Sequence, residues 1–72
     1  MSFVFFESRI INKDAIIAVY VQYRAFEEDY APVCELSGSK SPLYLSSPTN
    51  DVNECKKIIE DFYNALRRPD YE

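Results

Sequence analysis

The strongest constraint on the fold is a change in residue pattern near residue 50. The first 46 residues carry most of the β-branched and aromatic side chains, which favour strands, whereas residues 51–68 carry one apolar stripe at helical spacing. The stripe comprises Val52, Cys55, Ile58, Ile59, Phe62 and Leu66. A strand-rich segment followed by one amphipathic helix predicts an α+β fold in which the helix covers one face of a sheet.

Four segments of the first part are predicted to be strands. They cover residues 3–11, 16–24, 32–37 and 42–46. The stretch Asn12-Lys13-Asp14 and the only glycine, Gly38, favour turns, and the charged residues 25–30 are expected to form a loop. Short connections make neighbouring strands antiparallel, so we expect a four-stranded antiparallel β-meander in two layers with the helix.

The helix is predicted over about residues 51–68. The segment Pro48-Thr49-Asn50-Asp51 supplies several candidate caps, and Asp51 has capping-box spacing to Glu54. Arg67 and Arg68 suit the C-terminal end of the helix dipole, and Pro69 ends the helix. Residues 69–72 are expected to be a loose tail. With 72 residues and no repeat or long linker, the chain is predicted to be one small domain.

Alternation along the strands assigns side chains to the two faces of the sheet. The face expected under the helix carries Val4, Phe6, Ile10, Ile17, Val19, Val21, Cys34, Leu36, Leu43 and Leu45. The opposite face carries Phe3, Phe5, Glu7, Arg9, Ala18, Tyr20, Glu35 and Tyr44. The second set contains four aromatic rings on a face that nothing else in the chain is expected to cover.

Those four rings, Phe3, Phe5, Tyr20 and Tyr44, are the candidate interface. Aromatic side chains are enriched in interface cores, and a domain of this size buries only about 60% of its unfolded surface, so a second subunit would supplement its core. The sequence thus favours a small non-catalytic protein–protein interaction module that forms a homodimer through the open sheet face. Burial of the rings within one chain, by another strand register or a curled sheet, remains an alternative.

The charge balance suggests a second hypothesis. Twelve acidic residues against eight basic ones give a net charge of −4, and the basic residues are dispersed, which argues against binding to nucleic acid. The acidic patch Glu27-Glu28-Asp29 would suit an acidic inhibitor or nucleic-acid mimic that binds a basic site on a larger protein. A solvated loop is the simpler explanation of the same residues.

The composition disfavours catalysis, metal binding and cofactor binding. The chain has no histidine and no CxxC pair, and its two cysteines, Cys34 and Cys55, lie 21 residues apart. We expect both to be buried free thiols, although one disulfide between them remains an alternative. The chain has neither a secretion-signal pattern nor an apolar run long enough to span a membrane, so a cytoplasmic, non-enzymatic protein is expected.

Overall fold

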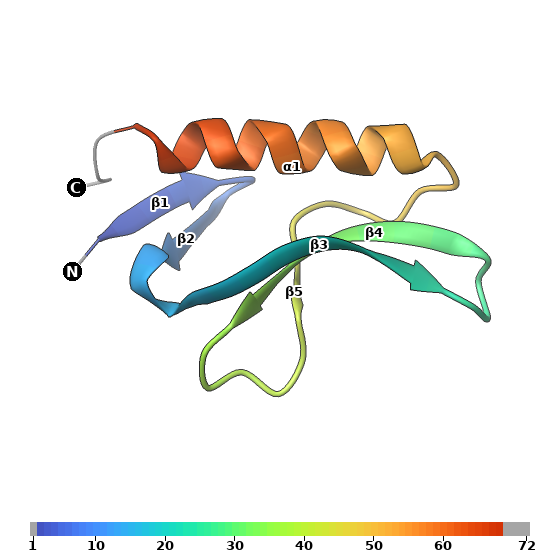
Figure 1. The fold of residues 1–72 in the computed structure, drawn as a ribbon, viewed down its shortest axis with the longest axis horizontal. Coiled ribbons are helices and arrows are strands. Elements are labelled where there is room, and N and C mark those ends of the chain that lie inside the picture. The colour runs from blue at the N-terminus through green and yellow to red at the C-terminus, as the bar shows by residue number, and fades with distance from the viewer. Residues whose placement is uncertain (1, 69–72) are drawn as a thin grey trace.

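The computed structural model describes residues 2–68 (Figure 1). Its elements are β1 (Phe3–Phe6), β2 (Arg9–Asn12), the 3-10 helix η1 (Lys13–Ala15), β3 (Ile16–Arg24), β4 (Asp29–Leu36), β5 (Leu43–Tyr44) and α1 (Val52–Leu66). The strands form two antiparallel sheets, β1-β2 and β3-β4-β5. The α+β class with a C-terminal helix is confirmed, but the strands do not form the single four-stranded meander that was expected.

The main cause of the difference is a turn inside residues 3–11, which were expected to be one strand. Glu7 and Ser8 form a two-residue turn between β1 and β2, and both have positive φ angles, 50° and 64°. Such turns are usually signalled by Asn-Gly or Asp-Gly, because these residues tolerate a left-handed backbone. Glu-Ser carries no such signal, so the sequence pattern concealed the turn.

The same turn changes which side chains of the hairpin face inward. Phe6 pairs with Arg9, so the inward positions are even-numbered in β1 and odd-numbered in β2. Ile11 is accordingly buried, whereas Ile10 is 56% exposed. The expected position of Ile10 under the helix is therefore wrong.

β3 has the predicted bounds, but it contains a bulge near its start. Ile16 pairs with Leu36 and Ala18 pairs with Glu35, so Ile17 is an extra residue on the β3 side. Ile17 is 62% exposed, while Ile16 packs against the core. The expected position of Ile17 under the helix is wrong for this reason.

β4 begins earlier than predicted, at Asp29 rather than residue 32, because the turn before it uses only residues 25–28. Arg24 pairs with Asp29 at the end of the β3–β4 ladder. Two of the six residues expected to form a loop, Asp29 and Tyr30, therefore belong to β4.

The predicted strand 42–46 is reduced to the two residues of β5, at the edge of the larger sheet. The chain nevertheless continues along β4. The Leu45 N–H donates to the Pro32 carbonyl at 2.8 Å, and Thr49 and Tyr30 exchange two main-chain hydrogen bonds of 2.8 Å. The edge of β4 that faces away from β3 is therefore paired with residues between Leu43 and Thr49.

The core lies where α1, the β1–β2 hairpin and the β3-β4-β5 sheet meet. Its buried residues are Val4, Ile11, Cys34, Leu45, Phe62 and Ala65. Figure 1 shows α1 running across both sheets, and the rings of Phe6 and Phe62 meet edge to face with centroids 5.1 Å apart. Seven of the residues expected under the helix belong to this core or pack against it: Val4, Phe6, Val19, Cys34, Leu36, Leu43 and Leu45.

Both ends of α1 are held by residues outside the helix. Asp51, one of the candidate caps, is the N-cap, and its carboxylate accepts from the Asn53 N–H at 2.9 Å. Glu54 does not complete a capping box with Asp51; it accepts from the Thr49 hydroxyl at 3.0 Å, and that hydroxyl accepts from the Asp51 N–H at 3.1 Å. At the other end, the Lys13 ammonium donates to the Leu66 carbonyl at 3.1 Å. The predicted tail, residues 69–72, lies outside the described residues.

Candidate functional site

The four rings of the predicted interface are divided between the two sheets. Phe3 and Phe5 lie in β1, Tyr20 lies in β3 and Tyr44 lies in β5. Tyr20 and Tyr44 both pair with Val33, so these two rings share one face of the larger sheet, on either side of a fully buried valine. Phe3 and Phe5 share the outward face of the small hairpin instead, so the four rings do not form one continuous sheet face.

The acidic patch lies in the turn at the end of the β3–β4 hairpin, at the right-hand end of the view in Figure 1. Its three members have different surroundings. The Arg24 guanidinium donates two hydrogen bonds to the Asp29 carboxylate, at 2.7 and 3.0 Å, and lies 4.0 Å from Glu27. Glu27 and Glu28 are exposed. Only these two carboxylates of the patch are therefore presented to solvent.

An aromatic residue that the sequence pattern did not single out lies beside them. Phe26 is fully exposed in this turn, between Ala25 and Glu27. The ring of Tyr23, which is 54% exposed, lies 5.2 Å from the ring of Tyr30 on the adjoining strand. We call Tyr23, Phe26 and Tyr30 the aromatic tip. The only sequence signal for Phe26 was an aromatic residue inside a charged segment. Because that segment was predicted to be a loop without periodicity, Phe26 was given no role.

At the base of the aromatic tip, hydrogen bonds of Arg24 shift the pKa of Arg24 itself and the pKa of Asp29. The two bonds from Arg24 lower the pKa of Asp29 below its ordinary value of 3.8. Hydrogen bonds to Asp29 and to Tyr44 raise the pKa of Arg24, so it is charged near neutral pH. The ion pair closes the strand ladder beneath the exposed turn.

This pair makes the stability of the hairpin depend on pH. A carboxyl group with a lowered folded-state pKa stabilises the fold above its unfolded pKa, and the stabilisation is lost as the pH falls through the folded pKa. We therefore expect the melting temperature of wild type to fall between pH 5 and pH 2.5 by more than that of Asp29→Asn, in thermal scans followed by circular dichroism. Glu28→Gln, which removes an exposed neighbouring carboxylate, is the matched control and should follow wild type. Equal slopes for wild type and Asp29→Asn would contradict the role given to this pair.

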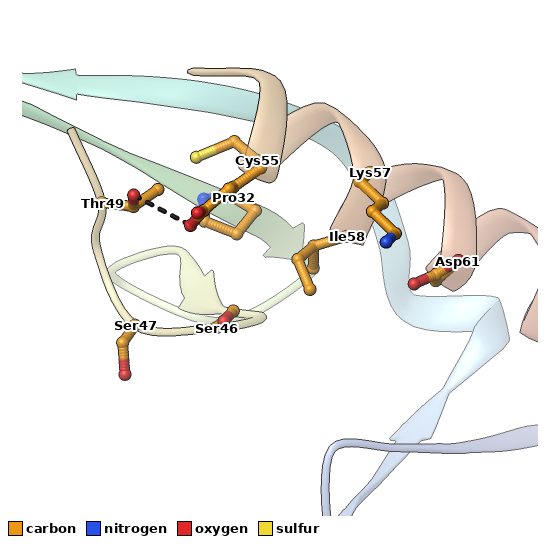
Figure 2. Close-up of a pocket in the computed structure, with 9 residues that line it drawn as sticks. Pro32, Ser46, Ser47, Thr49, Cys55, Lys57, Ile58 and Asp61 are labelled. Carbon is orange, nitrogen blue, oxygen red and sulfur yellow. Dashed lines mark hydrogen bonds between the residues drawn. The ribbon is translucent and has the colours of Figure 1, made fainter. Parts of the chain in front are cut away.

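A half-open hollow of about 430 Å³ lies between α1 and residues 46–49 (Figure 2). Pro32 and Ile58 form its apolar wall, and the hydroxyls of Ser46, Ser47 and Thr49 line the loop side. Glu54, Lys57 and Asp61 come from the helix. The Thr49 hydroxyl donates to the Glu54 carboxylate at 3.0 Å, the dashed line that starts at Thr49 in Figure 2, so this carboxylate is already engaged.

Cys55 also borders the hollow, but its thiol is a poor nucleophile. Burial, together with the negative charges of Glu54, Asp51 and Asp29, raises the pKa of Cys55, and burial raises the pKa of Cys34. Both thiols are therefore protonated near neutral pH. Both are free and buried, as predicted, and no disulfide joins them.

Between residues 2 and 68, no three side chains of the His, Cys, Asp and Glu types are grouped so as to bind a metal ion. Within the same residues, α1 is too short and too polar to cross a lipid bilayer. Comparison of the chain with protein-family models, with curated proteins and with solved structures finds no match. Function must therefore be argued from the surface of the molecule itself.

Proposed function

We propose that the protein is a non-catalytic protein–protein interaction module that contacts its partner through the aromatic tip. The full exposure of Phe26 at the end of the β3–β4 hairpin is the observation that carries this proposal. Isolated exposed aliphatic residues are common, but an aromatic ring with its entire surface in water gains most from entering a pocket. The half-exposed ring of Tyr23 on the adjoining strand adds apolar surface at the same end of the hairpin.

The base of the tip is held in shape before any partner binds. Arg24 and Asp29 are joined by two hydrogen bonds, and Tyr23 packs against Tyr30 on the adjoining strand. Tyr30 is bonded in turn to Thr49 by two main-chain hydrogen bonds. A preorganised contact loses less conformational entropy on binding, which favours affinity.

Charge defines the chemistry of the partner. Glu27 and Glu28 adjoin Phe26, and the chain carries a net charge of −4. The partner that fits is a protein with an apolar pocket bordered by Lys or Arg, and its association should be faster at low salt. The acidic patch expected from the sequence thus serves as the rim of the contact, whereas a nucleic-acid mimic would need a longer array of free carboxylates.

The test places a photo-crosslinking amino acid at position 26 and, as the control, at the exposed position Lys40 in the native host. A protein captured from position 26 alone is then purified and its affinity measured. Phe26→Ser should weaken binding at least tenfold, as is typical of an anchor residue, and Glu27→Gln with Glu28→Gln should reduce the salt dependence. Phe5→Ser, at another exposed ring, should leave the affinity unchanged. Equal capture from both positions, or an affinity unaffected by Phe26→Ser, would reject the proposal.

The cytoplasm is the compartment we propose for this function, because two free thiols persist where thiols are kept reduced. The homodimer predicted through Phe3, Phe5, Tyr20 and Tyr44 stays a prediction; because these rings are divided between two sheets, we do not propose them as one contact surface.

A further inference from the structure

β3 is an edge strand and also the longest strand of the protein. Eight of its nine residues pair with β4 on one side, and within residues 2–68 no strand pairs with its other side. The opposite edge of this sheet is covered by β5 and by the bridge from Thr49 to Tyr30. The outer edge of β3 therefore presents unpaired main-chain donors and acceptors.

The hydrogen bonds of β4 show which residues of β3 point outward. The Pro32 carbonyl and both main-chain groups of Tyr30 bond toward the β5 side of β4, away from β3. In an antiparallel ladder, residues opposite these are non-hydrogen-bonded pairs, so their own N–H and C=O groups point to the other side. Val21 pairs with Pro32 and Tyr23 pairs with Tyr30. By the same alternation, Val19, Val21 and Tyr23 direct their main-chain groups to the outer edge.

β3 has almost none of the features by which natural edge strands avoid pairing. Such strands usually carry lysine, proline or inward-pointing charge, or are very short. Between Ile16 and Tyr23 there is no charged residue and no proline, and Arg24 stands at the far end. The bulge near Ile17 affects only the start of the strand. The six residues from Ala18 to Tyr23 form a regular, uncharged template.

We propose that the outer edge of β3 pairs with the same edge of a second copy of this chain, antiparallel about a two-fold axis at Val21. In this register Val21 faces the partner's Val21, and Val19 faces the partner's Tyr23. All three outward-directed residues of each copy are then used, which gives about six main-chain hydrogen bonds. An axis at Tyr20 would place one of the three opposite the bulged Ile17, so it is the poorer register.

Side chains are compatible with this register. Tyr20 lies opposite the partner's Gln22, and Ala18 lies opposite the partner's Arg24, so no two charges of like sign meet. The two Arg24 side chains are at opposite ends of the interface, roughly 20 Å apart along the strands. The two aromatic tips then point in opposite directions, so the dimer could contact two partner proteins at once. The strand pairing itself does not depend on the proposed function.

The first test is the mass in solution and two substitutions that act on the edge. Wild type should have twice the 8.4 kDa chain mass by sedimentation at a few hundred micromolar. Val21→Pro removes an outward N–H that bonds nothing within the described residues, so it should give a folded monomer. Ala18→Lys places a cation opposite the partner's Arg24 and beside its own Glu35, so it should weaken the dimer about tenfold without weakening the fold. Ala18→Gln is the neutral control and should retain wild-type affinity.

If Val21→Pro does not fold, amide hydrogen exchange of the wild-type protein tests the same strand pairing. The amides of Val19, Val21 and Tyr23 should gain protection as concentration rises, while the amides directed to β4 should already be protected. A mass of one chain at every concentration, or outward amides that exchange equally fast throughout, would overturn the proposal. Phe26→Ser should leave the mass unchanged, which separates this outcome from failure of the proposed function.

Discussion

Phe62→Ala is expected to lower the free energy of unfolding by about 3–5 kcal/mol and to leave the chain largely unfolded at room temperature. Phe62 is fully buried, meets Phe6 edge to face and belongs to the core shared by α1 and both sheets. A domain of this size has little stability to spare, so removing its largest buried ring takes away most of what it has. Urea unfolding followed by circular dichroism, at one fixed protein concentration, measures the effect.

The neighbouring Tyr63 provides the matched control, because it is an aromatic residue of the same helix that is 46% exposed. Tyr63→Ala should change the free energy of unfolding by about 0.5 kcal/mol or less. If Phe62→Ala stayed folded and its free energy of unfolding fell by less than about 1 kcal/mol, the core described between α1 and the two sheets would be wrong.

The largest expected gain comes from the turn between β1 and β2. Glu7 and Ser8 both occupy the left-handed region, which costs a non-glycine residue about 1–2 kcal/mol. The double substitution Glu7→Asn with Ser8→Gly supplies the residues that this turn favours, so it should raise the free energy of unfolding by about 1–2 kcal/mol. The same urea titration measures it.

Ser39→Gly is the control for that experiment. Ser39 is exposed and is not among the residues with positive φ, so glycine there relieves no strain and should give no gain. If Ser39→Gly and the turn variant had equal effects, backbone strain at Glu7 and Ser8 would not be the cause.

The parts of the fold that the sequence predicted well are those with a long, regular pattern. The apolar stripe placed α1 to within two residues at each end, and the capping residue, Asp51, was among the candidates that the sequence offered. β3 was also found at its predicted bounds, since alternation over nine residues is a strong signal. Both patterns reflect burial of one face of a regular element.

The errors came from single residues that interrupt a pattern without a sequence signal. The turn at Glu7 and Ser8 divided one predicted strand into two and placed Ile10 outward, and the bulge did the same to Ile17. A change of one position moves a side chain to the other face, which explains Ile10 and Ile17. The predicted rings were separated because β1 and β2 form a sheet of their own, apart from β3 and β5. Phe26 was overlooked because exposure in a turn leaves no periodic trace.

Thr49 adds a hydrogen-bonded link between the long hairpin and the first turn of α1. Its main chain is bonded to Tyr30 at the end of the long hairpin, while its hydroxyl bonds Asp51 and Glu54 in the first turn of α1. Fraying of the helix start and loosening of the hairpin base are therefore coupled as one local unfolding event. Mechanical load on the turn that bears Phe26 would reach the helix start through this threonine as well as through the packed core.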